Sequence, residues 1–333
     1  MLISPPKRKR VVSTPNVLPD ALVSRFAADV ARLIGDGGSQ RFAIAVSGGP
    51  DSVALLLLAA AAFPQQVEAA TVDHRLRAAS ADEAAFVARL CTERGIPHSI
   101  LTLDRLPQGN LSAEARKARY AVLDDWADAR GLDWLMTAHH ADDQRETMIM
   151  RLNRGAGVGG LSCIRARQGR IVRPLLNWRH RELCEIVTHA GIVAIDDPTN
   201  HDDAFDRARL RKLLMDVHWI DAQAVALSAA ALADADAAIG WAVDRFAATH
   251  VSRDGAAVIF DRQADDFANE ILRRLVLRCL HTIDPDNAPR GVALTRFIAA
   301  LEQGATATLG TVQASGGKVW RFMPAASRRP VRS

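Results

Sequence analysis

Short apolar runs alternate with longer helical patterns from residue 21 to about residue 215. Residues 41–46 read RFAIAV, which predicts a buried strand, and residues 53–63 are wholly apolar, which predicts a buried helix. The same alternation continues along the chain. It predicts strands near residues 67–72, 98–103 and 134–137, and helices over 21–34, 79–94, 112–130, 142–153, 178–190 and 205–215.

Strands separated by helices of this length predict an α/β fold, with a parallel sheet and helices on both of its faces. Near residue 220 the pattern changes to long alanine-rich helices, expected at 223–248, 267–281 and 294–304. A chain of 333 residues exceeds the usual size of one domain. We therefore expect a flexible basic tail over 1–20, a catalytic domain over 21–220 and a smaller, mainly helical domain over 221–333.

The composition, 49% hydrophobic and 24% charged, is that of a chain that buries a core, and it excludes a disordered protein. The longest apolar run has 11 residues, short of the ~20 that span a bilayer as a helix. Because no apolar run follows the basic residues 7–10, no signal peptide is predicted, and we expect a cytoplasmic protein. The four cysteines form no C-x-x-C pair, so we expect reduced thiols, neither disulfides nor a zinc or iron–sulfur site.

The net charge of +4 is concentrated at the two ends of the chain. Residues 1–10 and 321–333 each carry four bases and no acid, so residues 11–320 have a net charge of −4. Within that body, residues 151–181 contain eight arginines and no acidic residue. This local cluster predicts a nucleic-acid contact.

The strongest chemical signal is the segment Ser47-Gly48-Gly49-Pro50-Asp51-Ser52 between the first strand and the apolar helix. Two glycines allow close approach of an anion, the serines add hydroxyl groups, and the following helix offers free N–H groups and the positive end of its dipole. Pyrophosphate fits such a turn, although a capped Gly-Gly turn would also explain each residue singly. No G-x-x-x-x-G-K-[ST] segment occurs, which excludes a Walker-type loop.

Two further segments follow predicted strands, where open α/β sheets bind ligands. Asp73 and His74 end the second strand, and a helix cap is the alternative explanation for them. After the fourth strand, His139 and Asp143 have i,i+4 spacing, and Asp143 and Glu146 have i,i+3 spacing, so on a helix they share one face that could hold a cation. A zinc site is one alternative interpretation of these residues, but the zinc-binding pattern H-E-x-x-H is absent. The other alternative is a solvated acidic helix start without a ligand.

Other segments carry weaker signals. Residues 155–160 satisfy G-x-G-x-x-G but follow a helix, not the strand that a dinucleotide site requires, so we interpret them as a loop near a phosphate backbone. Arg116, Arg119 and Tyr120 lie within one helical turn, and residues 207–212 form a basic helix face. Both could equally be ordinary amphipathic surfaces.

The order of these motifs resembles the PP-loop ATP pyrophosphatases and, among them, the tRNA(Ile)-lysidine synthetase family. The matching segments are SGGPDS (47–52), VDHRLR (72–77), AEARKARY (113–120), TAHHADDQRET (137–147), RLNRGAGVGGL (151–161), RPLL (173–176) and DDPTNHDDAFDRARLR (196–211). The resemblance implies adenylation of C2 of cytidine 34 in the CAU anticodon of tRNA(Ile), followed by attack of L-lysine to give lysidine, AMP and diphosphate.

The resemblance also implies roles for single residues. Residues of the 47–52 loop would hold ATP and its Mg²⁺, which would be bound mainly through the phosphates without a separate protein metal site. Asp73, His74 and Arg119 would serve adenosine binding or catalysis. His139 and Asp143 would lie beside the cytidine, and Asp143 and Glu146 would steer the lysine ammonium. Arg211 matches a functional arginine, although Ala208 stands where the family usually has Asn.

The region after residue 221 matches nothing in the family pattern, and no protein partner or membrane contact is expected. Two rival functions remain. A tRNA thiolase would use cysteines in C-x-x-C arrangements, and this chain has none. A non-catalytic RNA-binding protein on the same fold would not need intact Ser/Asp/Ser and His/Asp/Glu groups.

Overall fold

The computed structural model describes residues 17–35, 39–73, 79–103, 111–195, 206–217, 219–262 and 266–325. The chain divides into two compact units, Met1–Ala233 and Asp234–Ser333. The division falls inside one long helix, α9 (Ala222–His250), whereas the sequence pattern placed the boundary in front of that helix. The expected tail over residues 1–20 lies almost wholly outside the described residues.

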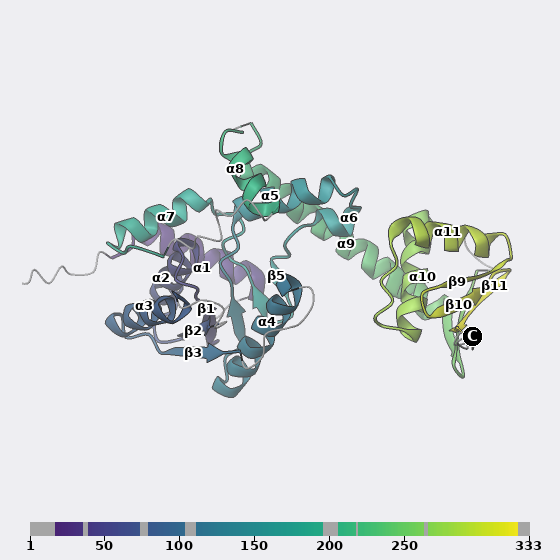
Figure 1. Cartoon of the computed structure of the whole chain (residues 1–333), viewed down its shortest axis with the longest axis horizontal. Helices are drawn as coiled ribbons and strands as arrows, with labels where there is room; N and C mark the ends of the chain where they lie inside the picture. The colour runs from purple at the N-terminus through teal and green to yellow at the C-terminus, as the bar shows by residue number, and fades with distance from the viewer. Residues whose placement is uncertain are drawn as a thin grey trace, which may run out of the picture. The chain divides into compact units, whose positions relative to one another are not determined.

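A six-stranded sheet forms the centre of the first unit, in the order β3-β2-β1-β4-β6-β5. Its strands are β1 (Phe42–Ala45), β2 (Val67–Asp73), β3 (His98–Thr102), β4 (Trp134–Met136), β5 (Arg167–Gln168) and β6 (Ile171–Val172). Neighbouring strands are parallel except β5 and β6, which form an antiparallel hairpin. Figure 1 shows β1, β2 and β3 side by side. The predicted parallel sheet is confirmed, while the hairpin was not predicted.

Alternating side chains of β1 face two separate cores, as the period of a strand requires. Phe42 and Ile44 pack with the helices α1 (Asp20–Ile34), α2 (Pro50–Ala62), α3 (Ala79–Glu93) and α7 (His180–His189) on one face. On the other face, Ala43 packs with Leu123 and Trp126 of α4 (Leu111–Arg130). Helices therefore cover both faces, as the sequence predicts.

The described part of the first unit also contains the helices α5 (Ala141–Leu152), α6 (Val158–Leu161) and α8 (Asp206–Met215). The short helix α6 lies within the glycine-rich segment that we interpreted as a loop. Met148 of α5 and Cys163 pack with Ala229 of α9 in a small separate core. The first part of α9 thus belongs to the first unit.

The second unit contains a five-stranded antiparallel sheet in the order β7-β8-β11-β10-β9. Its strands are β7 (Val251–Asp254), β8 (Ala257–Asp261), β9 (Thr306–Leu309), β10 (Val312–Ser315) and β11 (Val319–Pro324). Two helices, α10 (Asn269–Ile283) and α11 (Gly291–Glu302), share a buried core with Phe260, Trp320 and Phe322 of this sheet. The expected helices are present, but the sheet was not predicted from the sequence.

Helix α9 is long and apolar enough, by length and composition, to cross a membrane. Its most apolar window of 18 residues has a mean hydropathy of 1.3, although no continuous apolar run marks it in the sequence. Alanines supply most of this hydropathy, and Ala222, Ala226 and Ala229 are buried within the first unit. One such helix is weak evidence for a membrane segment.

Candidate active site

The segment Ser47–Ser52 connects β1 to α2 and forms a tight turn at the carboxyl end of the sheet. Helix α2 begins at Pro50, so Pro50, Asp51 and Ser52 lie in its first turn, three residues earlier than the apolar pattern predicts. The buried Ser52 hydroxyl donates to the carbonyl of Gly49 over 2.9 Å and accepts the Ser47 N–H over 3.2 Å. These bonds fix the turn with the N-terminus of α2 beside it, the arrangement that binds anions.

Gly48 has a backbone conformation that only glycine adopts easily, with φ of 91°. A Cβ at this position would also lie 2.6 Å from the side chain of Ile195. The Ile195 N–H donates to the Gly48 carbonyl over 3.0 Å, so the segment after α7 packs directly on the turn. The backbone conformation therefore favours glycine here, and any larger residue would also have to displace the end of the Ile195 side chain.

Asp73 is the last residue of β2, which pairs with β1 in parallel. Because the carboxyl ends of parallel strands meet at one edge, Asp73 lies at the same sheet edge as the Ser47–Ser52 turn. His74, predicted beside it, lies outside the described residues, as does the segment 196–205 with its DDPTN motif.

His139 lies in the loop between β4 and α5, not on the helix as the i,i+4 spacing assumed. The helix begins one residue after His140, which is its N-cap, and the Asp143 carboxylate accepts the His140 N–H over 3.1 Å. Asp142 and Asp143 thus stand in the first turn, where the helix dipole favours negative charge. The structure therefore has the acidic helix start, and Asp143 also bonds to the backbone of His140.

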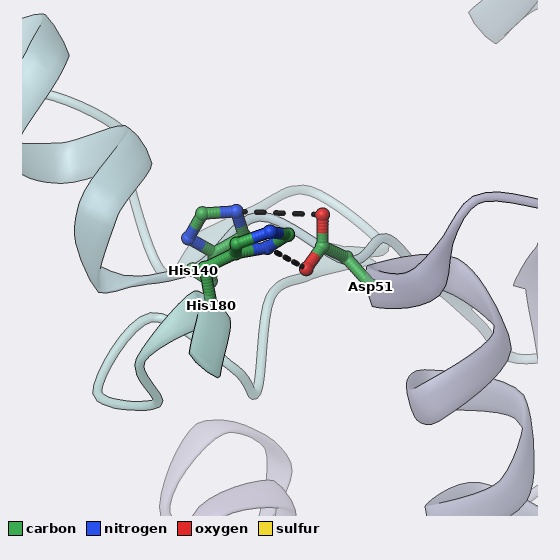
Figure 2. A group of neighbouring side chains, drawn as sticks. All are labelled: Asp51, His140 and His180. Carbon is green, nitrogen blue, oxygen red and sulfur yellow. Dashed lines mark hydrogen bonds and ion pairs between the residues drawn. The ribbon is translucent and has the colours of Figure 1, made fainter. Parts of the chain in front are cut away.

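Asp51 lies against two histidines from different segments (Figure 2). Its carboxylate is 2.7 Å from Nδ1 of His180, the first residue of α7, and 3.5 Å from Nε2 of His140. The two rings are 5.3 Å apart between centroids. This contact joins the Ser47–Ser52 turn to the start of α5 and to the start of α7.

Charge in this cluster is balanced by the carboxylates around His140. Burial alone would lower the pKa of His140, but Asp143, Asp51 and Asp142 outweigh burial and raise the pKa to about 9. Burial would raise the pKa of Asp51, yet hydrogen bonds and charge from His140 and His180 hold that pKa well below its usual range. At neutral pH His140 is therefore a cation between ionised carboxylates.

His139 has the opposite charge state. Burial lowers its pKa to about 3; the charge of Asp143 opposes this shift, and the guanidinium groups of Arg173, Arg116 and Arg207 add to it. Its Nδ1 is 3.0 Å from the Thr137 hydroxyl, and its Nε2 is 3.5 Å from a guanidinium nitrogen of Arg116. Because arginine only donates, Nε2 accepts and the proton resides on Nδ1.

The two adjacent histidines should titrate far apart. In NMR spectra of the imidazole protons, we expect His140 to change near pH 9 and His139 to stay neutral over about pH 5 to 8. The pKa of His140 is raised on folding, so its contribution to stability is complete below its unfolded pKa of about 6.5 and is lost as the pH rises through about 9. His139→Gln and His140→Gln variants assign the signals. A titration of His140 near its unfolded value would contradict this charge arrangement.

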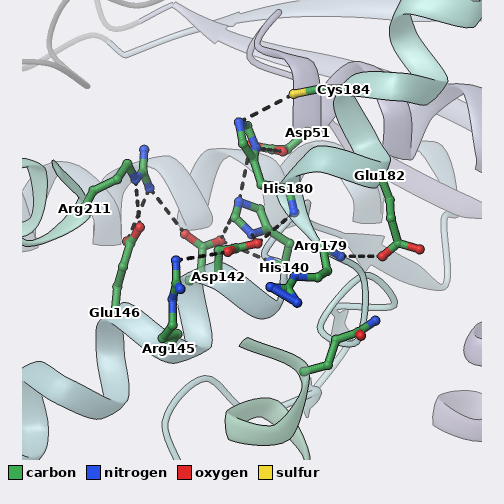
Figure 3. A network of polar contacts seen from close by, with 12 residues as sticks. Asp51, His140, Asp142, Arg145, Glu146, Arg179, His180, Glu182, Cys184 and Arg211 are labelled. Carbon is green, nitrogen blue, oxygen red and sulfur yellow. Dashed lines mark hydrogen bonds and ion pairs between the residues drawn. The ribbon is translucent and has the colours of Figure 1, made fainter. Parts of the chain in front are cut away.

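Asp143 and Glu146 share one face of α5, as the spacing predicts, and two arginines of α8 cover it. Arg207 donates to both carboxylates over 2.7 Å, and Arg211 Nε donates to Glu146 over 2.7 Å. Figure 3 shows Arg211 over Glu146, beside the cluster of Asp51, His140 and His180. Burial would raise the pKa of Asp143, but His140 and Arg207 lower it. The face that we expected to hold a cation already holds two guanidinium groups.

Comparisons with known proteins decide the family. Residues 22–218 match the PP-loop domain family. A tRNA(Ile)-lysidine synthase from Zymomonas mobilis is 43% identical over 87% of this chain and 90% of its own length. Another from Novosphingobium aromaticivorans is 42% identical over 92% of this chain and 94% of its own. The chain belongs to the tRNA(Ile)-lysidine synthase family.

A solved structure outside this family has the same fold. A U34-tRNA thiolase from Methanococcus maripaludis, with a [4Fe-4S] cluster, aligns with a TM-score of 0.53 at 16% identity, over 64% of this chain and 79% of its own. In this chain, the free thiols of Cys91, Cys163 and Cys279 are buried, and that of Cys184 is partly exposed. None of them belongs to a metal-binding group among the described residues.

Several site residues of this family member were not selected from the sequence. His140 lies beside the selected His139, and Arg116 contacts His139 over 3.5 Å. The guanidinium of Arg119, which was selected for adenosine binding or catalysis, lies 5.5 Å from the ring centre of Tyr120. His180 carries no sequence signal, because it is brought to Asp51 only by the packing of α7 on α2. We also expected no protein metal site, yet ligand atoms of Asp51, His140 and His180 lie within 4.8 Å of one another.

The arginine cluster at 151–181 mostly serves the protein's own structure. Arg165 donates to the Ala233 carbonyl, Arg167 to the Leu33 carbonyl, and Arg170 is paired with Asp124 and Asp128. The buried Arg173 donates to the carbonyl of Arg165. By contrast, Arg154 is exposed and has no ion pair with the described residues. A nucleic-acid contact by the 151–181 cluster stays a prediction.

Arg170→Ala should destabilise the first unit, because it removes two ion pairs and a hydrogen bond to the Leu132 carbonyl. We expect a loss of about 1 kcal/mol, since Asp124 and Asp128 are exposed. Thermal unfolding measures it, with Arg154→Ala as the matched control that should leave the melting temperature unchanged. An equal melting temperature for the two variants would show that the contacts of Arg170 do not stabilise the fold.

Proposed function

We propose that the protein ligates L-lysine to C2 of cytidine 34 in the CAU anticodon of tRNA(Ile), using ATP. The observation that carries this proposal, together with the family, is the contact of Asp51 with His140, which brings the phosphate-type turn against the helix that carries Asp143 and Glu146. One side of this site is built for an anion and the other for a cation. A reaction that joins an adenylate to an amine needs both.

The Ser47–Ser52 turn is proposed to bind the triphosphate of ATP, with Gly48 and Gly49 close to the phosphates and the N-terminus of α2 facing them. Oxygen atoms of Ser47, Asp51 and Ser52 are the ligand type that Mg²⁺ prefers, so this donor set fits a magnesium ion held mainly through phosphates. When bound, Mg²⁺ would neutralise the charge that develops on the departing pyrophosphate. We predict that Asp73, His74 and Arg119 bind the adenosine of ATP or take part in catalysis.

In the first half-reaction, O2 of the cytidine attacks the α-phosphorus and pyrophosphate leaves. His139 and Asp143 are the proposed neighbours of the cytidine. Because His139 is neutral, its ring can pack or bond near the base without adding a charge that repels the arginines around it. Asp143, ionised and fixed by His140, can stabilise the positive charge that spreads over the adenylated pyrimidine ring.

In the second half-reaction, the lysine side-chain amine forms a bond to C2, the bond from C2 to O2 breaks, and AMP leaves with that oxygen. Asp143 and Glu146 are the proposed anchors of the incoming ammonium. In the described structure the guanidinium groups of Arg207 and Arg211 hold those carboxylates in place. Both arginines are about 40% exposed, so they can shift when another cation enters, and Arg211 then becomes available to AMP.

The protein is proposed to act in the cytoplasm on tRNA(Ile), without a membrane or a protein partner. The exposed Arg154, which follows α5, is the best-placed candidate of the 151–181 cluster for a phosphate contact. Such a contact acts through counterion release and gives no base specificity.

Pyrophosphate release from ATP tests the proposal. We expect release to require tRNA(Ile) with the CAU anticodon and a full turnover to require lysine. A non-catalytic RNA-binding protein would release no pyrophosphate, and a thiolase would require a sulfur donor in place of lysine. Either of those results would overturn the proposal.

A further inference from the structure

Three side chains with nitrogen and oxygen donors meet at the mouth of the Ser47–Ser52 turn. They are the Asp51 carboxylate and the imidazoles of His140 and His180, all within 4.8 Å of one another. We propose that they form a binding site for a borderline divalent transition metal such as Zn²⁺, which would share the Asp51 carboxylate with the Mg²⁺ that would accompany ATP.

The donor set selects the kind of metal. Two imidazoles and one carboxylate suit Zn²⁺, Cu²⁺ or Ni²⁺, whereas Mg²⁺ takes oxygen ligands almost alone. Zn²⁺ binds such ligands at about 2.0 to 2.2 Å, often three from protein with the fourth position open. Asp51 and His180 are 28% and 49% exposed on their side chains, so they have room to close by the small distance needed.

Of the two histidines, His180 has a hydrogen-bond partner for its second ring nitrogen, the arrangement found in most metal sites. His180 faces Asp51 through Nδ1, and its Nε2 is 3.5 Å from Sγ of Cys184, one turn further along α7. His140 faces Asp51 through Nε2, and its Nδ1 is 3.7 Å from Oδ2 of Asp142. That Nδ1 is buried and has no hydrogen-bond partner within the described part of the chain.

Asp142 also fixes His180 in place. Its carboxylate accepts the backbone N–H of His180 over 2.8 Å, which caps the first turn of α7 (Figure 3). Asp142 therefore reaches both histidines, one through the ring and one through the backbone. These contacts hold the start of α7 beside the start of α5, with both imidazoles facing Asp51 (Figure 2).

The neighbouring carboxylates Asp143 and Glu146 have other partners, although Oδ2 of Asp143 also lies 3.6 Å from Nε2 of His140. Asp143 accepts the His140 N–H and an Arg207 guanidinium, and Glu146 is paired with Arg207 and Arg211. Asp51 carries no such arginine in the described residues. A metal here would replace the protons in the two Asp51–histidine contacts.

Metal binding to the substrate-free protein tests the site without reference to its activity. We expect Zn²⁺, measured by competition with a chromophoric chelator, to bind one equivalent, and Co²⁺ to give the visible absorption of a nitrogen- and oxygen-ligated ion. His180→Ala should weaken binding by about 100-fold or more, and Cys184→Ser by no more than about 10-fold. His189→Ala removes an exposed histidine from the same helix and should leave binding unchanged.

Several results would overturn the proposal. These are the absence of stoichiometric Zn²⁺ binding to the unaltered protein, equal binding by His180→Ala and His189→Ala, and a greater loss in Cys184→Ser than in His180→Ala. Displacement of Zn²⁺ by an equal concentration of Mg²⁺ would count equally against it. Circular dichroism of each variant establishes that the fold is kept, so that weakened binding reports the lost ligand.

Discussion

Asp51→Ala should abolish tRNA-dependent pyrophosphate release, with a loss on the order of 10³-fold or more. The carboxylate stands in the first turn of α2 beside the glycine turn, and it is the group that links this turn to His140 and His180. Without it, the proposed magnesium site loses its one carboxylate, and the two histidines lose the anion between them. Rapid measurement of pyrophosphate at saturating ATP gives the rate directly.

The fold should survive this change, because the Asp51 side chain is partly exposed and packs in no apolar core. Asp20→Ala is the matched control: it removes an exposed acid from the first turn of another helix, α1. Normal pyrophosphate release by Asp51→Ala would remove Asp51 from the reaction. A fall of equal size in Asp20→Ala would point to a general effect on stability.

Asp143→Asn should slow both half-reactions by on the order of 10²-fold or more. The Asp143 carboxylate balances the charge of His140, accepts a bond from Arg207 and is nearly buried, so its charge acts in a medium where attraction exceeds its value in water. Asparagine keeps the shape but leaves the His140 charge less compensated. Pyrophosphate release and lysine incorporation, measured separately, should fall together.

Glu146→Gln should instead separate the two half-reactions. We expect a higher lysine requirement with pyrophosphate release largely preserved, because Glu146 is proposed to hold the ammonium and not the nucleotide. The fold should tolerate the change, since Arg207 and Arg211 remain about 40% exposed to water. Loss of pyrophosphate release with an unchanged lysine requirement would place Glu146 in the nucleotide site.

The fold of the first unit could be predicted because its signals are local. The run at 41–46 and the wholly apolar segment after the glycine turn gave β1 and α2 almost directly. The β5–β6 hairpin could not be found in this way, because its strands have two residues each. In the second unit, β11 does alternate, with Trp320 and Phe322 buried and Arg321 and Met323 exposed, but the longer helical patterns around it were more conspicuous.

The candidate site was predictable where its residues follow strands. The Ser47–Ser52 turn and the start of α5 both come directly after central strands, so their chemistry is visible in short motifs. His180 and Arg207 arrive from helices far along the chain, and only tertiary packing places them on Asp51 and Asp143. The i,i+4 argument for His139 failed because the helix starts after His140, so His139 lies in the preceding loop and His140 is the N-cap.

Mass analysis of tRNA nucleosides measures the proposed reaction itself. The protein is incubated with ATP, isotopically labelled lysine and tRNA(Ile) carrying the CAU anticodon, and the tRNA is then digested. We predict one labelled nucleoside with the mass of cytidine plus lysine minus water, formed only with ATP and absent for Asp51→Ala. An unmodified cytidine in the complete reaction, or label on any other nucleoside, would contradict the proposed function.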